Sequence, residues 1–181
     1  WNFSSWDGNA LMFLALDIGN SHVFCAIHDA KKWIHSIRIS SNLDFWNKFK
    51  TLKEYDITHA AISSVVPRLT SVYVESLRNI FHINTFIISY ENAGLELKVA
   101  IPEEVGTDRI CNTVAAKDLI GCPAIIGDIG SATNYDVVNE KGAFIGGAIA
   151  PGLETAARNL FDKAALLKET AFTVPPSAIG R

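Results

Sequence analysis

The sequence predicts an α/β fold in which the same succession of strands and helices starts at two places in the chain. Two stretches, residues 14–21 and 124–133, repeat a single pattern: an apolar strand that ends in Asp-x-Gly and continues into small hydroxyl or amide residues. Their acidic residues are Asp17 and Asp128. Strands, and then alternating helices and strands, follow the first copy, and the second copy starts the same order again. The repetition predicts two related halves within one chain.

Each Asp-x-Gly turn has the chemistry of a phosphate and cation site. A carboxylate at the end of a buried strand can hold a hydrated cation, and the glycine lets the backbone come close to a ligand. The amides and hydroxyls that follow can face phosphate oxygens. One copy would be an ordinary turn, but two matched copies predict a nucleotide in the cleft between the halves. The residues expected there are Asp17 and Asp128 at the metal, and Gly19, Asn20, Ser21, Gly130, Ser131, Ala132 and Thr133 at the phosphates.

Alternation of apolar residues and turn signals predicts the elements in order. Pro67 suits the first turn of a helix, because a proline there loses no hydrogen bond. The expected strands are Met12–Ile18, His22–Ala30, Trp33–Ile39, Ala60–Val66, Ile83–Ser89, Ala124–Asp128, Thr133–Asn139 and Ala143–Gly147. The expected helices are Leu43–Lys53 with Asn42 or Asp44 near its cap, Pro67 to about Phe81, Gly106–Leu119 and Gly152–Leu167.

The elements divide the chain into an extension and two domains. Residues 1–11 are polar and aperiodic, lack the charged and apolar regions of a signal peptide, and are excluded from the fold. The first domain is expected over residues 12–121, and the second over residues 122–181. The stretch from Thr170 to Arg181 contains prolines and no clear final element, so we expect the second domain to be incomplete.

Composition excludes several classes of partner. The 181 residues are 49% hydrophobic and 19% charged, which suits a packed core. The net charge is -3 with no basic run, so neither nucleic acid nor an anionic membrane is expected as a partner. The least charged segment, Gly142–Leu153, is short and broken by glycine and proline, which argues against a membrane span. Cys25, Cys111 and Cys122 show no Cys-x-x-Cys spacing and indicate reduced thiols of a cytoplasmic protein.

A third motif, at residues 104–109, carries an acidic residue next to a basic one. Gly106 allows a tight turn, Thr107 is expected to cap a helix, and Asp108 and Arg109 fall in the first helical turn. Alone, this is a capped helix with an acid favoured by the helix dipole. Beside two phosphate turns it favours a carboxylate that accepts a hydroxyl proton and a guanidinium that fixes a substrate carboxylate or phosphate. The sequence lacks Gly-x-x-x-x-Gly-Lys-Ser/Thr, which excludes a P-loop kinase.

Five motifs together resemble the type III pantothenate kinases. They are Asp-Ile-Gly-Asn-Ser at 17–21, Ser-Ser-Val-Val-Pro at 63–67, Pro-Glu-Glu-Val-Gly-Thr-Asp-Arg at 102–109, Asp-Ile-Gly-Ser-Ala-Thr at 128–133 and Gly-Gly-Ala-Ile-Ala-Pro-Gly at 146–152. The resemblance implies two ribonuclease-H-like halves with mixed sheets, as in the actin-like ATPases, and ATP between them. It also implies ATP-dependent phosphorylation of pantothenate to 4'-phosphopantothenate, the first step of coenzyme A biosynthesis.

The resemblance also implies individual roles and partners. Family members are homodimers that use Mg²⁺-ATP and a monovalent cation, K⁺ or NH₄⁺. Carried over by position, Asp108 would be the general base, Gly106, Thr107 and Arg109 would contact pantothenate, Asp17 with Asn20 would lie near Mg²⁺-ATP, and Asp128 with Ser131 would form the second phosphate turn and offer a ligand to the monovalent cation.

This chain departs from the family pattern at three places. Val99 stands where the family has a tyrosine expected to line the pantothenate pocket, and Ser131 and Asn134 replace threonines of the second turn. The family also continues beyond the position of Arg181, with a threonine that enters the partner's site and with closing helices. We therefore expect exposed apolar surface on the strands between 124 and 147. The alternative left open is a non-catalytic truncated pseudoenzyme or a regulatory accessory protein.

Overall fold

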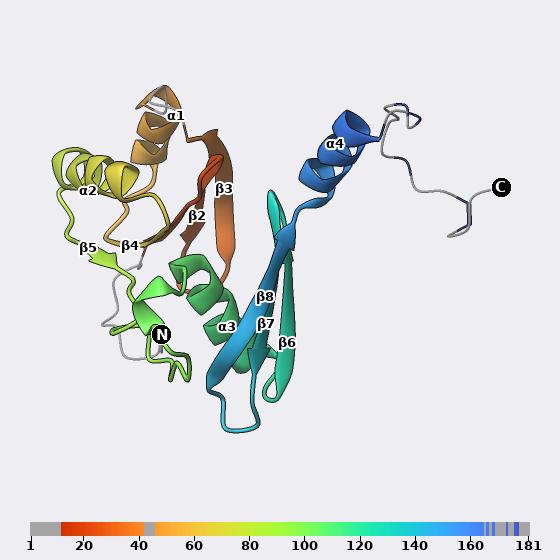
Figure 1. Cartoon of the computed structure of the whole chain (residues 1–181). Coiled ribbons are helices and arrows are strands. Elements are labelled where there is room, and N and C mark those ends of the chain that lie inside the picture. The colour runs from red at the N-terminus through yellow and green to blue at the C-terminus, as the bar shows by residue number, and fades with distance from the viewer. Residues whose placement is uncertain are drawn as a thin grey trace.

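The computed structural model of the 181-residue chain describes residues 12–41 and 46–164, together with 166, 168, 173, 176 and 177 (Figure 1). This part of the chain is an α/β structure with a five-stranded sheet and a separate three-stranded sheet. The predicted fold class is therefore confirmed. The expected extension at 1–11 and the expected helix cap at 42–44 lie outside the described residues.

The larger sheet is mixed. Its strands are ordered β3-β2-β1-β4-β5, and β1 is antiparallel to β2 but parallel to β4. The fifth strand is shorter than the predicted 83–89, because the Asn92 amide donates to the carbonyl of Ile87 and turns the chain there. The strands are β1 (Phe13–Ile18), β2 (His22–His28), β3 (Trp33–Ser40), β4 (His59–Ser64) and β5 (Thr85–Ile87).

Helices α1 (Trp46–Thr51) and α2 (Pro67–Phe81) cover one face of this sheet (Figure 1). The second of them begins at Pro67 and ends at Phe81, as predicted. A short 3-10 turn, η2 (Leu52–Glu54), completes the predicted helix at 43–53. None of the described helices combines the length and the hydropathy that crossing a membrane requires.

Strand β1 explains which way the first acidic turn faces. Leu14, Leu16 and Ile18 are buried in the core under α1 and α2, and the residues between them point to the other face. Asp17 is one of those residues. The period of two along the strand thus places this carboxylate on the face of the sheet that α1 and α2 do not cover.

The smaller sheet is antiparallel, in the order β6-β7-β8. Its last strand is longer than the predicted 143–147, because Ile149 to Pro151 continue to pair with β7. The predicted helix at 152–167 runs over Leu153–Lys163, and Leu167 lies outside the described residues. The remaining elements are β6 (Ala124–Ile129), β7 (Ala132–Val138), β8 (Phe144–Pro151), η3 (Pro102–Glu104), α3 (Thr107–Leu119) and α4 (Leu153–Lys163).

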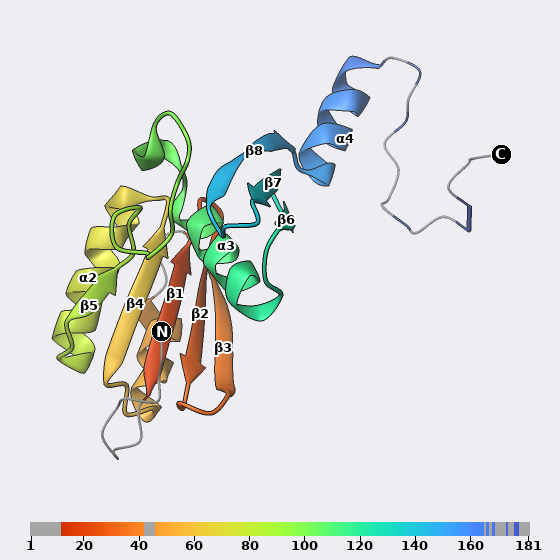
Figure 2. The same cartoon turned by 90° about the horizontal axis from the view of Figure 1, so that it is seen from below.

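Helix α3 lies between the two sheets and contacts β4 on one side and β6 and β7 on the other (Figures 1 and 2). Its buried Ile110 packs with Leu95 and Phe144 in a second, smaller core. The opposite face of the small sheet exposes Ile125 and Ile129, each at 75%. The predicted exposure of apolar surface on these strands is confirmed.

Two isoleucines on strands of the two sheets provide a test of this burial. We expect Ile129→Thr to change the free energy of unfolding by less than about 0.5 kcal/mol, because an exposed side chain loses little burial. The same change at the fully buried Ile62 should cost about 2–4 kcal/mol, since it removes packing and buries a hydroxyl. Urea unfolding followed by circular dichroism measures both. Equal losses would mean that Ile129 is covered in solution.

Candidate functional site

The two Asp-x-Gly turns occupy equivalent positions along their strands, although β1 is central in its sheet and β6 lies at an edge. Asp17 and Asp128 are each the second-last residue of a strand, β1 and β6, and each strand turns directly into an antiparallel partner. The amides of Gly19 and Gly130 close the turns with backbone hydrogen bonds of 3.0 and 2.9 Å. The predicted repetition of strand, acid and hairpin is confirmed.

The first turn is held by a serine from the end of β3. Ser41 donates its hydroxyl to the carbonyl of Gly19 at 2.8 Å, and its amide donates to the carbonyl of Ser21 at 3.0 Å. Asn20 and Ser21 are exposed. The turn therefore has a fixed backbone and presents an amide and a hydroxyl side chain to the solvent.

The second turn is held by the beginning of α4. Gly152 donates its amide to the carbonyl of Ser131 at 3.1 Å, and the Thr155 hydroxyl donates to the same oxygen at 3.3 Å. A Cβ atom on Gly152 would overlap the carbonyl oxygen of Gly130. Only glycine allows this close approach of helix and turn.

Thr107 joins α3 to the end of β4. Gly106 is the N-cap of α3, and Thr107 is its first helical residue. The Thr107 hydroxyl accepts the amide of Ser64 at 2.9 Å, donates to the carbonyl of Ser64 at 3.0 Å, and accepts the Ser63 hydroxyl at 3.2 Å. The prediction that Thr107 caps the helix is wrong, because the backbone at the end of β4 uses its hydroxyl instead.

Asp108 folds back over the beginning of α3. Its Oδ1 accepts the backbone N–H of Arg109 at 2.8 Å. A Cβ atom on Gly106 would overlap that same carboxylate oxygen. The glycine therefore provides the space that the Asp108 carboxylate occupies at the positive end of the helix.

The carboxylates of Asp17, Asp108 and Asp128 share one electrostatic environment. Asp17 is open to solvent on one side. Burial of its carboxylate nevertheless raises its pKa; a hydrogen bond from Ser63 opposes this, and the charges of Asp108 and Asp128 raise the pKa further. The charges of Asp108 on α3 and of Asp128 on β6 thus both reach the carboxylate of Asp17 on β1.

These acids fit a cation that is shared with a ligand. Among the described residues, no group of three or more His, Cys, Asp or Glu side chains is close enough to enclose a metal. Mg²⁺ in phosphoryl-transfer sites is commonly held by one or two carboxylates together with substrate phosphates. Burial is the main cause of the raised pKa of Asp17, and repulsion from Asp108 and Asp128 adds to it. A cation would relieve that repulsion, so the residues present suit this kind of site.

Asn112 belongs to the site although the sequence analysis did not include it. It lies one helical turn after Asp108 on α3, and its amide donates to Oδ2 of Asp128 at 3.2 Å. The i, i+4 spacing from Asp108 is the signal that could have found it, since such residues share one helix face. Asn112 holds Asp128 from across the gap between α3 and β6.

Asp136 was also missed, and it pairs with Arg109. It is 1% exposed on β7, and its Oδ1 accepts both Nε and Nη2 of Arg109, at 2.9 and 2.5 Å. The guanidinium lies 5.5 Å from the ring centroid of Phe144. Half-buried Val99 packs against the core that contains Phe144. The signal in the sequence was a lone acid within the apolar strand Tyr135 to Val138.

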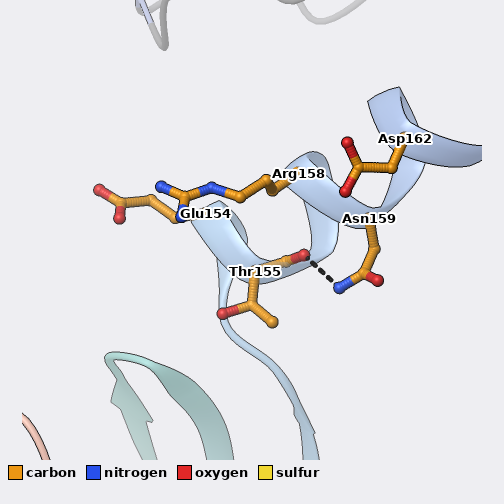
Figure 3. A pocket seen from close by; sticks show the side chains of 5 residues that line it. All are labelled: Glu154, Thr155, Arg158, Asn159 and Asp162. Atoms are coloured by element: carbon orange, nitrogen blue, oxygen red, sulfur yellow. Dashed lines mark hydrogen bonds between the residues drawn. The ribbon is translucent and has the colours of Figure 1, made fainter.

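A hollow on the surface of α4 lies apart from these residues (Figure 3). It is formed by one helix, and the side-chain amide of Asn159 donates to the carbonyl of Thr155 at 2.9 Å within it. It contains none of the predicted site residues. Its lining residues are Glu154, Thr155, Arg158, Asn159 and Asp162.

The buried pair makes Arg109 important for stability. We expect Arg109→Met to lower the free energy of unfolding by about 3–5 kcal/mol, because it leaves the Asp136 carboxylate buried without a partner. Adding Asp136→Asn should recover part of the loss by removing the buried charge. The control Arg38→Met, at an exposed arginine, should change stability by less than about 0.5 kcal/mol. Chemical denaturation measures all three, and an Arg109→Met variant as stable as the control would contradict the expectation.

Comparisons with solved structures support the fold. The structure is similar to the Aquifex aeolicus Ppx/GppA phosphatase, with a TM-score of 0.54 and 15% sequence identity, over 84% of this chain and 56% of that one. It is also similar to a Baf family transcriptional activator from Campylobacter jejuni, with a TM-score of 0.51 and 18% identity, over 90% of this chain and 68% of that one. At such identities the likeness concerns the fold alone, and it confirms the predicted actin-like ATPase fold.

Comparisons of sequence identify the family. A protein named type III pantothenate kinase from Thermomicrobium roseum is 36% identical over 182 aligned residues, which cover 94% of this chain and 70% of that protein. One of the same name from Dictyoglomus turgidum is also 36% identical, over 94% of this chain and 71% of that protein. Both relatives are longer than this chain. Residues 13–181 match the family described as type III pantothenate kinase, and the chain belongs to that family.

Proposed function

We propose that this chain transfers the terminal phosphoryl group of ATP to pantothenate and forms 4'-phosphopantothenate, the first step of coenzyme A biosynthesis. Membership of a kinase family supports this. The observation in the structure that carries it is the common environment of Asp17, Asp108 and Asp128. Phosphoryl transfer needs positioning and neutralisation of charge rather than covalent chemistry by the protein. The non-catalytic alternative is not favoured, because the relatives are named as kinases.

Asp108 is proposed as the general base. Its carboxylate lies at the beginning of α3, fixed by the amide of Arg109 and by the space over Gly106. There it would accept the proton of the pantothenate hydroxyl as that oxygen attacks the terminal phosphorus of ATP and ADP leaves. Thr107 supports this geometry, since its three hydrogen bonds fix the first turn of α3 against β4.

Arg109 is proposed to bind the carboxylate of pantothenate. The Asp136 pair satisfies Nε and Nη2, and Nη1 has no hydrogen-bond partner among the described residues. A guanidinium binds a carboxylate through charge-assisted hydrogen bonds. Gly106, Thr107 and Val99 are proposed to line the same pocket, with Val99 adding apolar surface in place of a phenol.

The two turns are proposed to bind ATP. Gly19, Asn20, Ser21, Gly130, Ser131, Ala132 and Thr133 would lie at the phosphates, with the amides of Gly19 and Gly130 kept in the hydrogen bonds that close the turns. Asp17 and Asp128 would hold Mg²⁺, and Asp128 would also serve a monovalent cation, K⁺ or NH₄⁺. When bound, Mg²⁺ neutralises charge on the phosphates. The charges of Asp108 and Asp128, which add to the effect of burial on the pKa of Asp17, support this assignment because neighbouring carboxylates attract a cation.

We also propose the wider organisation of the protein. Residues 12–121 and 122–181 would form the two halves, and the protein would act as a homodimer in the cytoplasm. Cys25, Cys111 and Cys122 are free thiols, which suits a reducing compartment. The net charge of -3 supports a small-molecule substrate rather than nucleic acid.

The Asp108 carboxylate is the first group to test. We expect Asp108→Asn to lower the kcat of pantothenate-dependent ADP release by about 10²–10⁴-fold, the usual contribution of a general base. Binding of Mg²⁺-ATP, measured by calorimetry, should change little. The exposed Asp118 on the same helix provides the control, and Asp118→Asn should retain full activity. Unchanged turnover in Asp108→Asn would remove Asp108 from the mechanism.

Asp17 gives a prediction with a defined pH dependence. Only its ionised form attracts a cation, so the affinity for Mg²⁺-ATP should rise with pH through its pKa, which lies above 3.8. Asp17→Asn should weaken binding by about tenfold or more and lose this part of the rise. Calorimetry at a series of pH values measures both effects.

The raised pKa also predicts the effect of Asp17 on stability. The folded protein favours the protonated carboxyl, so without metal the protein should lose stability as pH rises through the pKa of Asp17. Asp17→Asn should remove that loss. Asp29 is the control: backbone hydrogen bonds from Lys32 and Lys31 lower its pKa, so it stabilises the fold above its unfolded pKa and loses this effect as pH falls.

For the binding prediction, an Asp17→Asn variant that bound nucleotide like wild type would contradict the proposed role of Asp17. Asp17 would then serve only to form the turn.

A further inference from the structure

We propose that Asp136 is a positioning residue that fixes the Arg109 guanidinium for the carboxylate of the substrate. The inference rests on the proposed function and extends it to a side chain on β7 that does not itself touch the substrate. Arg109 lies on α3, and Asp136 lies on the central strand of the small sheet. A side chain on β7 thus fixes the position of the substrate-binding guanidinium on α3.

The hydrogen bonds of the pair leave one edge of the guanidinium for a ligand. Nε and Nη2 both donate to Oδ1 of Asp136, at 2.9 and 2.5 Å. Asp136 is buried at 1% exposure, whereas the side chain of Arg109 retains 15%. The inner edge of the guanidinium is therefore fixed by a buried acid, and Nη1, which meets none of the described residues in a hydrogen bond, belongs to the outer edge.

Two further groups limit the movement of the guanidinium. The Phe144 ring lies under it, with the central carbon 5.5 Å from the ring centroid. Gly147 of β8 lies beside it, and a Cβ atom there would come within 2.9 Å of Nη2 of Arg109 and 2.7 Å of Oδ1 of Asp136. The same Cβ would overlap the carbonyl oxygen of Tyr135, so the glycine is required by the β7 backbone and also leaves room for the pair. An arginine held in this way loses little rotamer freedom when a ligand binds.

Stability alone does not account for the pair. Apolar side chains commonly replace a buried ion pair with no loss of stability. Here Oδ2 of Asp136 is buried and accepts no hydrogen bond from the described residues, so the carboxylate is not used as a fully satisfied structural bridge. A fork-to-fork pair would use both oxygens and two nitrogens. The observed geometry instead concentrates both contacts on one oxygen and orients the arginine.

The test compares pantothenate with its alcohol analogue, in which a hydroxymethyl group replaces the carboxylate. Asp136→Asn keeps the shape of the side chain and removes its charge. We expect the KM and Kd for pantothenate to rise about 10–100-fold, as for loss of a charged hydrogen bond, while kcat and the KM for ATP stay within about threefold. For the alcohol analogue, wild type and Asp136→Asn should agree within about threefold, because no carboxylate meets Arg109.

A second variant keeps the test open if Asp136→Asn does not fold. Phe144→Leu removes the ring under the guanidinium and leaves the ion pair, and should raise the KM for pantothenate alone by about 3–10-fold. Circular dichroism confirms the fold of each variant. Equal losses with pantothenate and with the alcohol analogue, or unchanged pantothenate binding, would overturn the positioning role. A wild-type protein that neither binds nor phosphorylates pantothenate would instead refute the proposed function itself, and the inference with it.

Discussion

The hydrogen bonds between the Thr107 hydroxyl and the backbone of Ser64 fix the helix on which the site is built. They join the first turn of α3 to the end of β4, next to the strand that carries Asp17. From this fixed beginning, α3 reaches the other sheet through two polar contacts, Arg109 with Asp136 and Asn112 with Asp128. The helix is thus the only described element whose side chains hydrogen-bond strands of both sheets. If its beginning moved, all three acids would change their relative positions.

Local chemistry explains what the sequence could predict. The two Asp-x-Gly turns were found because strand, acid, glycine and hairpin are neighbours in the chain, and their backbone geometry follows from those few residues. The beginning of helix α2 was predicted correctly because Pro67 can begin a helix without losing a hydrogen bond, and its end agrees with the approximate end predicted at Phe81. The face on which Asp17 lies follows from strand alternation, given which face the core covers.

Contacts between distant segments explain what could not be predicted. Threonine is a common residue type at helix caps, but the hydroxyl of Thr107 bonds to a strand more than forty residues earlier. The residues around Thr107 in the sequence cannot show that contact. Asp136 looks like a solvent-facing acid until α3 brings Arg109 against it. Strand β8 extends beyond its predicted end because it continues to pair with β7, although its glycines have a low propensity for strands. The role of a side chain that contacts a distant element can be recognised only in the folded structure.

One of the acids proposed to carry the chemistry is also a residue whose charge the folded protein disfavours. Burial, together with the charges of Asp108 and Asp128, raises the pKa of Asp17 and so disfavours its ionised form in the folded protein, and groups of this kind are commonly kept for function rather than for stability. The apolar cores lie elsewhere, under α1 and α2 and around Phe144. Binding of a ligand at the acids would stabilise the folded protein, because the folded state alone brings them together.

The contact of Gly152 with the second turn has a mechanical consequence. Its backbone lies directly on Gly130 and Ser131, with no side chain between them to absorb a displacement. The second turn and the N-cap residue of α4 are therefore packed backbone against backbone. Any side chain at position 152 would have to push the turn and the helix apart, so α4 can keep its place only while this residue stays a glycine.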